Sequence, residues 1–218
     1  MKLSKRLEAL YDLIPTDSRL VDIGTDHGLL MIRAIESGKS THAYGLDINP
    51  MPLDQARENI ARHNLEDKIE LVLSDGLDKF EGNGDCFVLA GMGAETIWEI
   101  MKVYSFSPSD TIIVQSNTKH PWFRETVSAN GFVIEDEVFL MDKGIAVFIM
   151  ALKKGVSKTL SYANCVIGPV LGQKLSVEYR DYLIEQHAHI KTIKHNRESL
   201  NALFEVLDNV VGKGSSHE

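Results

Sequence analysis

The chain has 218 residues, of which 44% are hydrophobic, and its formal net charge is −8. This length suits one medium domain, or a domain of about 150 residues with an appendage. No stretch approaches the ~20 apolar residues of a membrane span, so we expect no membrane-spanning segment. The acidic charge argues weakly against nucleic acid as a partner.

The charge is unevenly distributed, because residues 151–218 are mildly basic and residues 1–150 are acidic. A polyanion can dock on such a tail, but an ordinary solvated helical surface has the same composition. Cys86 and Cys165 are far apart and lack metal-ligand spacing, which predicts buried reduced thiols and no metal site. The basic N-terminus is followed by no apolar signal core, so we expect a cytoplasmic protein.

Apolar residues follow helical and strand spacing in alternation along the first 152 residues. We expect helices at 3–14, 28–38, 51–64, 94–104 and 120–129. We expect strands at 19–24, 42–47, 69–73, 86–90, 111–115, 131–140 and 145–152. Alternating strands and helices predict an α/β fold with a mostly parallel sheet, and the last two strands form an antiparallel hairpin. This order resembles the seven-stranded, Rossmann-like sheet of methyltransferases.

The pattern of apolar residues changes after Lys153-Lys154-Gly155, because residues 174–208 have helical apolar spacing. The positions at this spacing are Tyr179, Leu183, Gln186, Ile190, Ile193, Arg197, Leu200, Phe204 and Leu207. The segment is one helix or a helical hairpin that breaks near His195-Asn196. We predict a sheet domain at 1–154, a coiled-coil-like helical domain at 155–211 and a disordered tail at 212–218. The oligomeric state is not predicted.

A glycine turn follows the first strand, where residues 22–28 read Asp-Ile-Gly-Thr-Asp-His-Gly. Gly24 and Gly28 allow backbone N–H groups and a helix N-terminus to face a ligand. The Gly-x-Gly-x-x-Gly fingerprint is absent, which disfavours a dinucleotide. S-adenosylmethionine (SAM) has no phosphate and fits better, with Asp22 near its ammonium group and the loop N–H groups near its carboxylate.

Acidic residues also end the next two strands. Asp47 lies where an acid takes the ribose hydroxyls, Ile48 can pack on adenine, and Asp75-Gly76 lies where a polar group meets the adenine amine. Each alone is more often a turn residue, but together they predict a SAM site. The residues predicted to bind SAM are Asp22, Gly24, Thr25, Gly28, Asp47, Ile48, Asp75, Gly76, Ala90, Gly91 and Met92.

Ala90-Gly91-Met92-Gly93 follows the fourth strand, where such enzymes hold the acceptor. Two glycines let the backbone approach a flat ring, and Met92 offers a polarisable contact. The alternative is a strand-to-helix turn with Met92 in the core. The Asn-Pro-Pro-Tyr motif of many nitrogen methyltransferases is absent.

These motifs together resemble those of the bacterial tRNA (adenine-22-N1)-methyltransferases. That family carries Gly-Ser-Asp-His-Ala, Asp-Gly-Leu, Ala-Gly-Met-Gly and Gln-Pro-Asn after successive strands. This chain has Gly24-Thr-Asp-His-Gly28, Asp75-Gly-Leu77, Ala90-Gly-Met-Gly93 and Gln115-Ser-Asn117. It departs from the family at Thr25, Gly28 and Ser116. The similarity covers nearly the whole chain.

The resemblance implies methyl transfer from SAM to N1 of an adenine in tRNA. Asp26 is the first catalytic candidate, because a carboxylate near N1 favours the cation that develops on the ring. His27 shapes the site or relays a proton. The structural alternatives are that Asp26 is a helix N-cap and that His27 only stabilises the fold. Gly93, Gln115 and Asn117 are expected at the base, or the two amides cap the next helix.

RNA contacts are expected from Arg6, Arg57, Arg62 and His63 in the sheet domain. Lys191, Lys194 and Arg197 are the candidates in the tail. Two other readings stay open at this point: a SAM-dependent methyltransferase of a small molecule, and a non-catalytic nucleotide-binding protein that oligomerises through its helices. A NAD-dependent oxidoreductase is disfavoured by the missing glycine fingerprint.

Overall fold

The computed structural model describes residues 3–156, 158–193 and 200–212. One seven-stranded sheet runs through it in the order β3-β2-β1-β4-β5-β7-β6. The strands are β1 Ser18–Ile23, β2 Ser40–Asp47, β3 Ile69–Leu73, β4 Cys86–Met92, β5 Thr111–Ser116, β6 Phe132–Asp142 and β7 Ile145–Lys154. The first five strands are parallel, and β7 runs antiparallel to both β5 and β6. The predicted α/β fold is confirmed.

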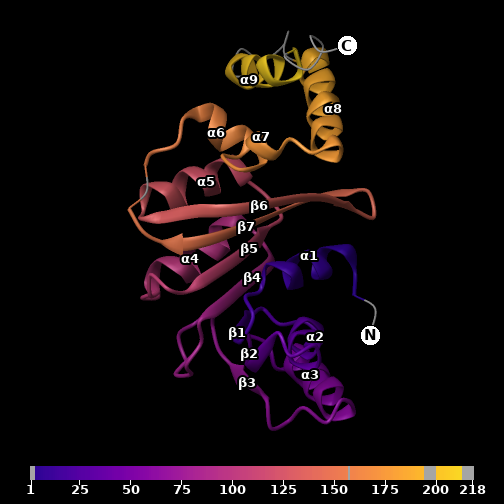
Figure 1. The fold of residues 1–218 in the computed structure, drawn as a ribbon, viewed down its shortest axis with the longest axis vertical. Coiled ribbons are helices and arrows are strands. Elements are labelled where there is room, and N and C mark those ends of the chain that lie inside the picture. The colour runs from indigo at the N-terminus through magenta and orange to yellow at the C-terminus, as the bar shows by residue number, and fades with distance from the viewer. Residues whose placement is uncertain (1–2, 157, 194–199, 213–218) are drawn as a thin grey trace.

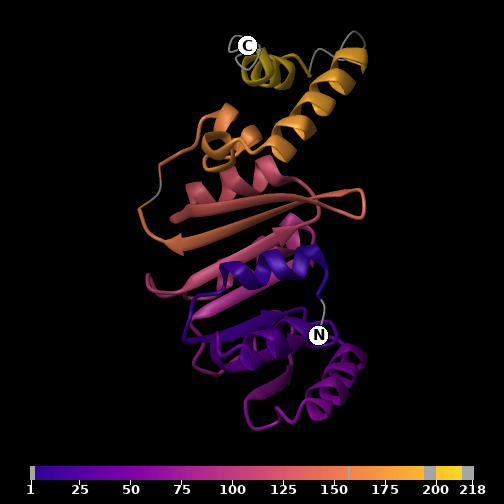
Figure 2. The same cartoon turned by 45° about the vertical axis from the view of Figure 1, so that its right-hand side comes forward.

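Helices cover both faces of this sheet (Figures 1 and 2). They are α1 Lys5–Leu13, α2 Leu29–Glu36, α3 Pro50–Arg62, α4 Ala94–Val103 and α5 His120–Ala129. The first three pack on one face, where Leu10, Ile32 and Ile60 are buried, and α4 and α5 pack on the other through Ile97 and Phe123. Each such buried side chain contributes about 1.5–3 kcal/mol of transfer free energy, which holds the three layers together.

The strand order reverses direction at β1, which has β2 on one side and β4 on the other. Crossover helices after β1 and β4 therefore leave on opposite faces of the sheet. A crevice opens between them at the carboxyl ends of these strands, and open α/β sheets bind ligands there. The topology places the glycine turn at residues 24–28 and the segment at residues 90–93 on the two sides of this crevice.

Among the described residues, four helices follow the sheet: α6 Tyr162–Ile167, α7 Leu171–Lys174, α8 Val177–Ile193 and α9 Asn201–Gly212. The two short ones are absent from the sequence-based expectation. Tyr179 and Leu183 of α8 and Leu207 of α9 are buried together with Phe139 and Phe148 of the β6–β7 hairpin. The spacing of the long tail segment therefore reflects packing of α8 against α9 and against β6 of the sheet.

Some predictions for the tail lie outside the described residues. These are the break near His195-Asn196, the basic residues Lys194 and Arg197, and the disordered tail beyond Gly212. The division into domains at residues 154 and 155 stays a prediction, although β7 does end at Lys154.

Cys86 and Cys165 are free and buried, as predicted. Burial raises the pKa of both thiols, which keeps them protonated and inert. In the described part of the chain, no helix combines the length and apolar character that crossing a membrane requires.

Candidate active site

The loop after β1 turns through residues in the left-handed backbone region. Gly24 has φ 76° and Gly28 has φ 69°. The backbone N–H groups of Gly24 and Thr25 donate to the carbonyl of Leu46 at 2.7 and 3.0 Å, which ties the loop to β2. A Cβ at Gly24 would lie 2.4 Å from Cε of Met92. The backbone angle therefore favours glycine at position 24, and any larger residue would also displace the end of the Met92 side chain.

Asp22 lies at the base of this loop with its side chain buried. Its Oδ2 accepts a hydrogen bond from the hydroxyl of Thr25 at 2.8 Å. Burial raises the pKa of Asp22 to about 6, although the Thr25 hydrogen bond and the Arg6 guanidinium both act to lower it. The carboxylate is thus ionised at neutral pH, but the Thr25 hydrogen bond and the Arg6 charge do not fully offset the cost of its burial. This suits it to bind a cationic group.

A cavity of about 310 Å³ lies between this loop and the carboxyl ends of β2, β3 and β4. It is lined by Ile23, Gly24, Leu46, Asp47, Ile48, Asn49, Ser74, Asp75, Gly76, Ala90, Gly91, Met92, Thr96 and Ile100. The structure thus brings together most residues predicted to bind SAM. Gly76 is required here, because a Cβ at this position would lie 2.9 Å from Cγ1 of Ile100. We call this the cofactor cavity.

A second cavity of about 610 Å³ lies beside it, towards α1 and the β6–β7 hairpin. Its lining comprises Arg6, Gly24, Asp26, Ala90, Gly91, Gln115, Asn117, Asp142, Lys143, Ile145, Ala146 and Val147. Gly24, Ala90 and Gly91 line both cavities. Molecules bound in the two cavities would meet at this stretch of backbone, and we call the second one the acceptor cavity.

Two side-chain amides hold Gly91 in its left-handed conformation, φ 81°. The backbone N–H of Gly91 donates to Oε1 of Gln115 at 3.1 Å, and Nδ2 of Asn117 donates to the Gly91 carbonyl at 2.8 Å. The two amides are joined by a 3.1 Å hydrogen bond from Nε2 of Gln115 to Oδ1 of Asn117. Arg6 donates to Oε1 of Gln115 at 3.0 Å.

Gln115 was predicted to meet the edge of the base or to cap a helix. Its buried side chain fixes the backbone of Gly91 and the guanidinium of Arg6, and it lines the acceptor cavity, so its contact with the base stays a prediction. Asn117 is exposed and keeps free hydrogen-bonding capacity towards the acceptor cavity. Gly93 is the N-cap residue of α4 and lines neither cavity.

Asp26 lines the acceptor cavity with 78% of its side chain exposed. Nε2 of His27 lies 3.2 Å from Oδ1 of Asp26, and the His27 backbone has φ 59°. The N-cap of α2 is Gly28, and no side chain caps that helix. The alternative of Asp26 as an N-cap is therefore wrong, and its carboxylate lies at the cavity beside the His27 ring.

The predicted RNA-contacting residues fall into two groups. Arg6, on α1, lines the acceptor cavity and is tied to it through Gln115. Arg57, Arg62 and His63 belong to α3 and its C-cap, and they line neither cavity. Their nearby carboxylates are Asp54, Glu58 and Glu36, respectively.

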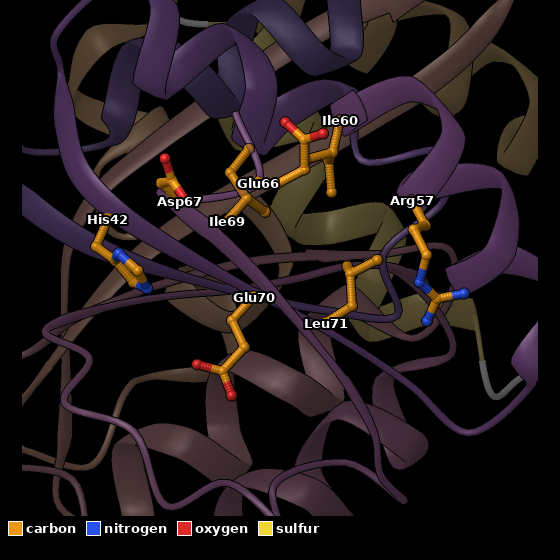
Figure 3. Close-up of a pocket in the computed structure, with 8 residues that line it drawn as sticks. All are labelled: His42, Arg57, Ile60, Glu66, Asp67, Ile69, Glu70 and Leu71. Carbon is orange, nitrogen blue, oxygen red and sulfur yellow. The ribbon is translucent and has the colours of Figure 1, made fainter. Parts of the chain in front are cut away.

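Arg57 borders a separate hollow of about 470 Å³ at the β3 edge of the sheet (Figure 3). In Figure 3 its guanidinium lies across the hollow from His42. Glu66, Asp67 and Glu70 also line it. Three carboxylates repel phosphate, so this hollow is unsuited to RNA. Among the described residues, no group of His, Cys, Asp or Glu is arranged to hold a metal ion.

Sequence reasoning missed the part of the acceptor cavity formed by the β6–β7 hairpin. Asp142, Lys143 and Ile145 lie at its tip. The hairpin turn itself can be predicted from the sequence, since Lys143-Gly144 separates two strands in which apolar and polar residues alternate. What the sequence did not reveal is that the β5–β7 pairing carries this tip to the same edge as the glycine loop.

Comparisons with known proteins agree with this geometry. The chain is similar to the tRNA (adenine(22)-N(1))-methyltransferase of Bacillus subtilis (strain 168), with 25% identity over 98% of this chain and 99% of the relative. The structure of Streptococcus pneumoniae Sp1610 in complex with S-adenosyl-L-methionine superposes with a TM-score of 0.88 and 25% identity, over 96% of this chain and 100% of that one.

A third similar protein is M. capricolum TrmK in complex with S-adenosyl-homocysteine. It has a TM-score of 0.79 and 28% identity, over 98% of this chain and 96% of that one. Residues 3–150 match the family described as methyltransferase domain. They include β1 to β6, the first part of β7 and the residues that line both cavities. The chain therefore belongs to the methyltransferase domain family.

Proposed function

We propose that this chain transfers a methyl group from SAM to N1 of an adenine in tRNA, at position 22 as in the Bacillus subtilis relative. One observation carries the proposal: Gly24, Ala90 and Gly91 form a shared wall between a cavity suited to SAM and a larger one open towards solvent. A cofactor and an extruded base can therefore face each other across a short stretch of backbone. We also propose a cytoplasmic location, where tRNA is modified.

The residues of the cofactor cavity fit SAM. Asp22 lies outside its lining, in an adjoining hollow of about 80 Å³ that shares Gly24 and Ala90 with it, and the buried Asp22 carboxylate suits the ammonium group. Asp47 uses Oδ1 to accept the N–H of Asn49 at 2.8 Å and keeps Oδ2 for ribose hydroxyls. Ile48 is exposed although it is apolar, which fits packing on adenine, and Asp75 is exposed near the expected place of the adenine amine.

When bound, SAM supplies an electrophilic methyl group, and its transfer to adenine N1 forms the N–C bond as the S–C bond breaks. Neutral adenine carries a lone pair on N1, so the protein need not remove a proton before attack. Its contribution is to position the base and to favour the positive charge that develops on the ring. Gly91, held by Gln115 and Asn117, sets the position of the base, and the exposed carboxylate of Asp26 faces the developing charge.

The test is incubation of the chain with methyl-labelled SAM and unmodified bulk tRNA, followed by nucleotide-resolved mapping. We expect label at N1 of one adenine, at position 22. Calorimetry with SAM and with NAD, run in parallel, should give binding of SAM alone. Label in small-molecule extracts but not in tRNA would indicate a small-molecule methyltransferase, and a chain that binds SAM but methylates nothing would overturn the enzymatic proposal.

A further inference from the structure

The tip of the β6–β7 hairpin stands over the acceptor cavity. Lys143 and Gly144 both have left-handed backbones, with φ 51° and 80°, which is the geometry of a tight two-residue hairpin turn. Figure 1 shows the hairpin reaching beyond the body of the sheet, next to α1. The backbone N–H of Arg6 contacts Oδ2 of Asp142 at 3.4 Å, which links the start of α1 to this tip.

The tip presents one apolar and one cationic side chain. Ile145 is 68% exposed, although it is a β-branched residue in a strand. Lys143 is exposed and forms no salt bridge with any described residue. Asp142 is the nearby opposite charge, and its carboxylate faces the backbone of Arg6. An unneutralised ammonium group therefore lies two residues from an uncovered isoleucine, and both line the acceptor cavity.

We propose that this tip is a wedge that helps to extrude the target adenine from the RNA. Ile145 fills the gap that the base leaves in the stack, and Lys143 neutralises a neighbouring backbone phosphate. This inference rests on the proposed tRNA substrate. Apolar side chains that enter base steps from a cationic surface act in this way in other nucleic-acid-binding proteins.

The size of the tip favours RNA over a protein partner. A stable protein interface covers about 800 Å² on each partner and needs a cluster of apolar anchors. Here one isoleucine and one lysine project beside a cavity, and the hairpin narrows to a two-residue turn. A single wedge beside a basic group is sufficient for a base step, because the stack supplies the complementary apolar surface.

The opposite end of the same hairpin supplies matched controls. Val133 and Lys153 are paired across β6 and β7 there, and both lie outside the two cavities. The variants are Ile145→Ser with control Val133→Ser, and Lys143→Ala with control Lys153→Ala. Each is tested with tRNA and with the same tRNA carrying the fluorescent base 2-aminopurine at the methylated position. Extrusion unstacks 2-aminopurine and raises its fluorescence, whether or not methyl transfer follows.

For Ile145→Ser we expect less than half of the fluorescence rise at saturating protein and a kcat about tenfold lower, with the Kd for tRNA within about threefold. For Lys143→Ala we expect weaker binding, a salt dependence reduced by about one unit of slope, and a normal fluorescence rise at saturation. The two controls should match the wild type in all of these quantities.

The inference is overturned if Ile145→Ser keeps the full fluorescence rise and kcat, or if Val133→Ser loses as much. It is also overturned if the wild type methylates tRNA without any fluorescence rise, and in that case the proposed function stands. A wild type that methylates no tRNA at all overturns the proposed function itself.

Discussion

Oε1 of Gln115 accepts the backbone N–H of Gly91 at 3.1 Å, which joins β5 to the carboxyl end of β4 at the wall between the two cavities. The same oxygen accepts a hydrogen bond from Nη1 of Arg6 at 3.0 Å. One buried amide therefore sets the position of an α1 side chain and of the backbone that both ligands would touch. Gln115 is a positioning residue in this arrangement.

Replacement of Gln115 by alanine should leave the Gly91 N–H and the Arg6 guanidinium without their acceptor. A buried group that loses its partner costs about 1–3 kcal/mol, so the free energy of unfolding should fall by that amount. The KM for tRNA should rise as Arg6 loses its orientation. Gln115→Glu is the comparison: it keeps the acceptor oxygen but loses the Nε2 donor to Ser116 and Asn117, so it should recover only part of the stability in urea unfolding. Equal losses in both variants would contradict this role.

Asp22 should make SAM binding depend on pH. Its pKa is raised to about 6 by burial, and only the ionised form attracts the SAM ammonium group. At pH 5 about one tenth of the free protein is ionised at this site, so the affinity should be about tenfold weaker than at pH 7. Calorimetry between pH 5 and 8 measures this. An Asp22→Asn variant should bind weakly with no such dependence, and a flat profile in the wild type would disprove the assignment.

Asp22 should also lower the stability of the unliganded protein as pH rises. Its folded pKa of about 6 lies above the value of 3.8 for an exposed aspartate, so the folded state binds more protons between these values. The free energy of unfolding therefore falls as pH rises through this window, by up to about 3 kcal/mol from this group. Asp22→Asn should be more stable than the wild type at pH 7, and about equally stable at pH 4, in thermal unfolding without SAM.

Asp26→Asn should reduce kcat about 100-fold, because it removes the negative charge that faces the developing cation. The Kd for SAM should stay within about twofold, because the Asp26 side chain, unlike that of Asp22, is largely exposed to solvent and lies outside the cofactor cavity. Single-turnover kinetics and calorimetry separate the two quantities. A fully active variant would remove Asp26 from the mechanism, and loss of SAM binding would move it to the cofactor site.

The ion pair between Arg124 and Glu137 should anchor the C-terminal helices to the sheet. Both side chains are buried, with Nε of Arg124 2.7 Å from Oε1 of Glu137. Glu137 also accepts the N–H groups of Val170 and Leu171, at 2.9 and 3.1 Å, and Arg124 donates to the carbonyl of Cys165 at 3.0 Å. The pair thus joins α5 and β6 to the segment that contains α6 and α7.

Glu137→Leu should destabilise the protein by about 3–5 kcal/mol, because it leaves a buried guanidinium without its partner. The double variant Arg124→Met/Glu137→Leu should lose less than the single one, since it leaves no uncompensated charge. Urea unfolding measures both. A double variant less stable than Glu137→Leu would show that hydrogen bonds from Arg124 to the α6 carbonyls outweigh the charge.

Most of the fold follows from local patterns. The strand at residues 69–73 and the helix at residues 120–129 have the predicted bounds, because each combines clear apolar spacing with a turn or proline beside it. The helices α6 and α7 were missed, since they are too short to show a period. They are held instead by Glu137 and Arg124, which are distant in the sequence.

The sequence by itself determined the class of fold, the glycine turn and the acids at the strand ends, because spacing and residue type act within a few residues. Only the tertiary structure decided what Gln115 binds, that Asp26 caps no helix, and that the tip at residues 143–145 faces the acceptor cavity. These relationships depend on strand order and on register between distant segments. Packing of the whole sheet sets both, and no local pattern records them.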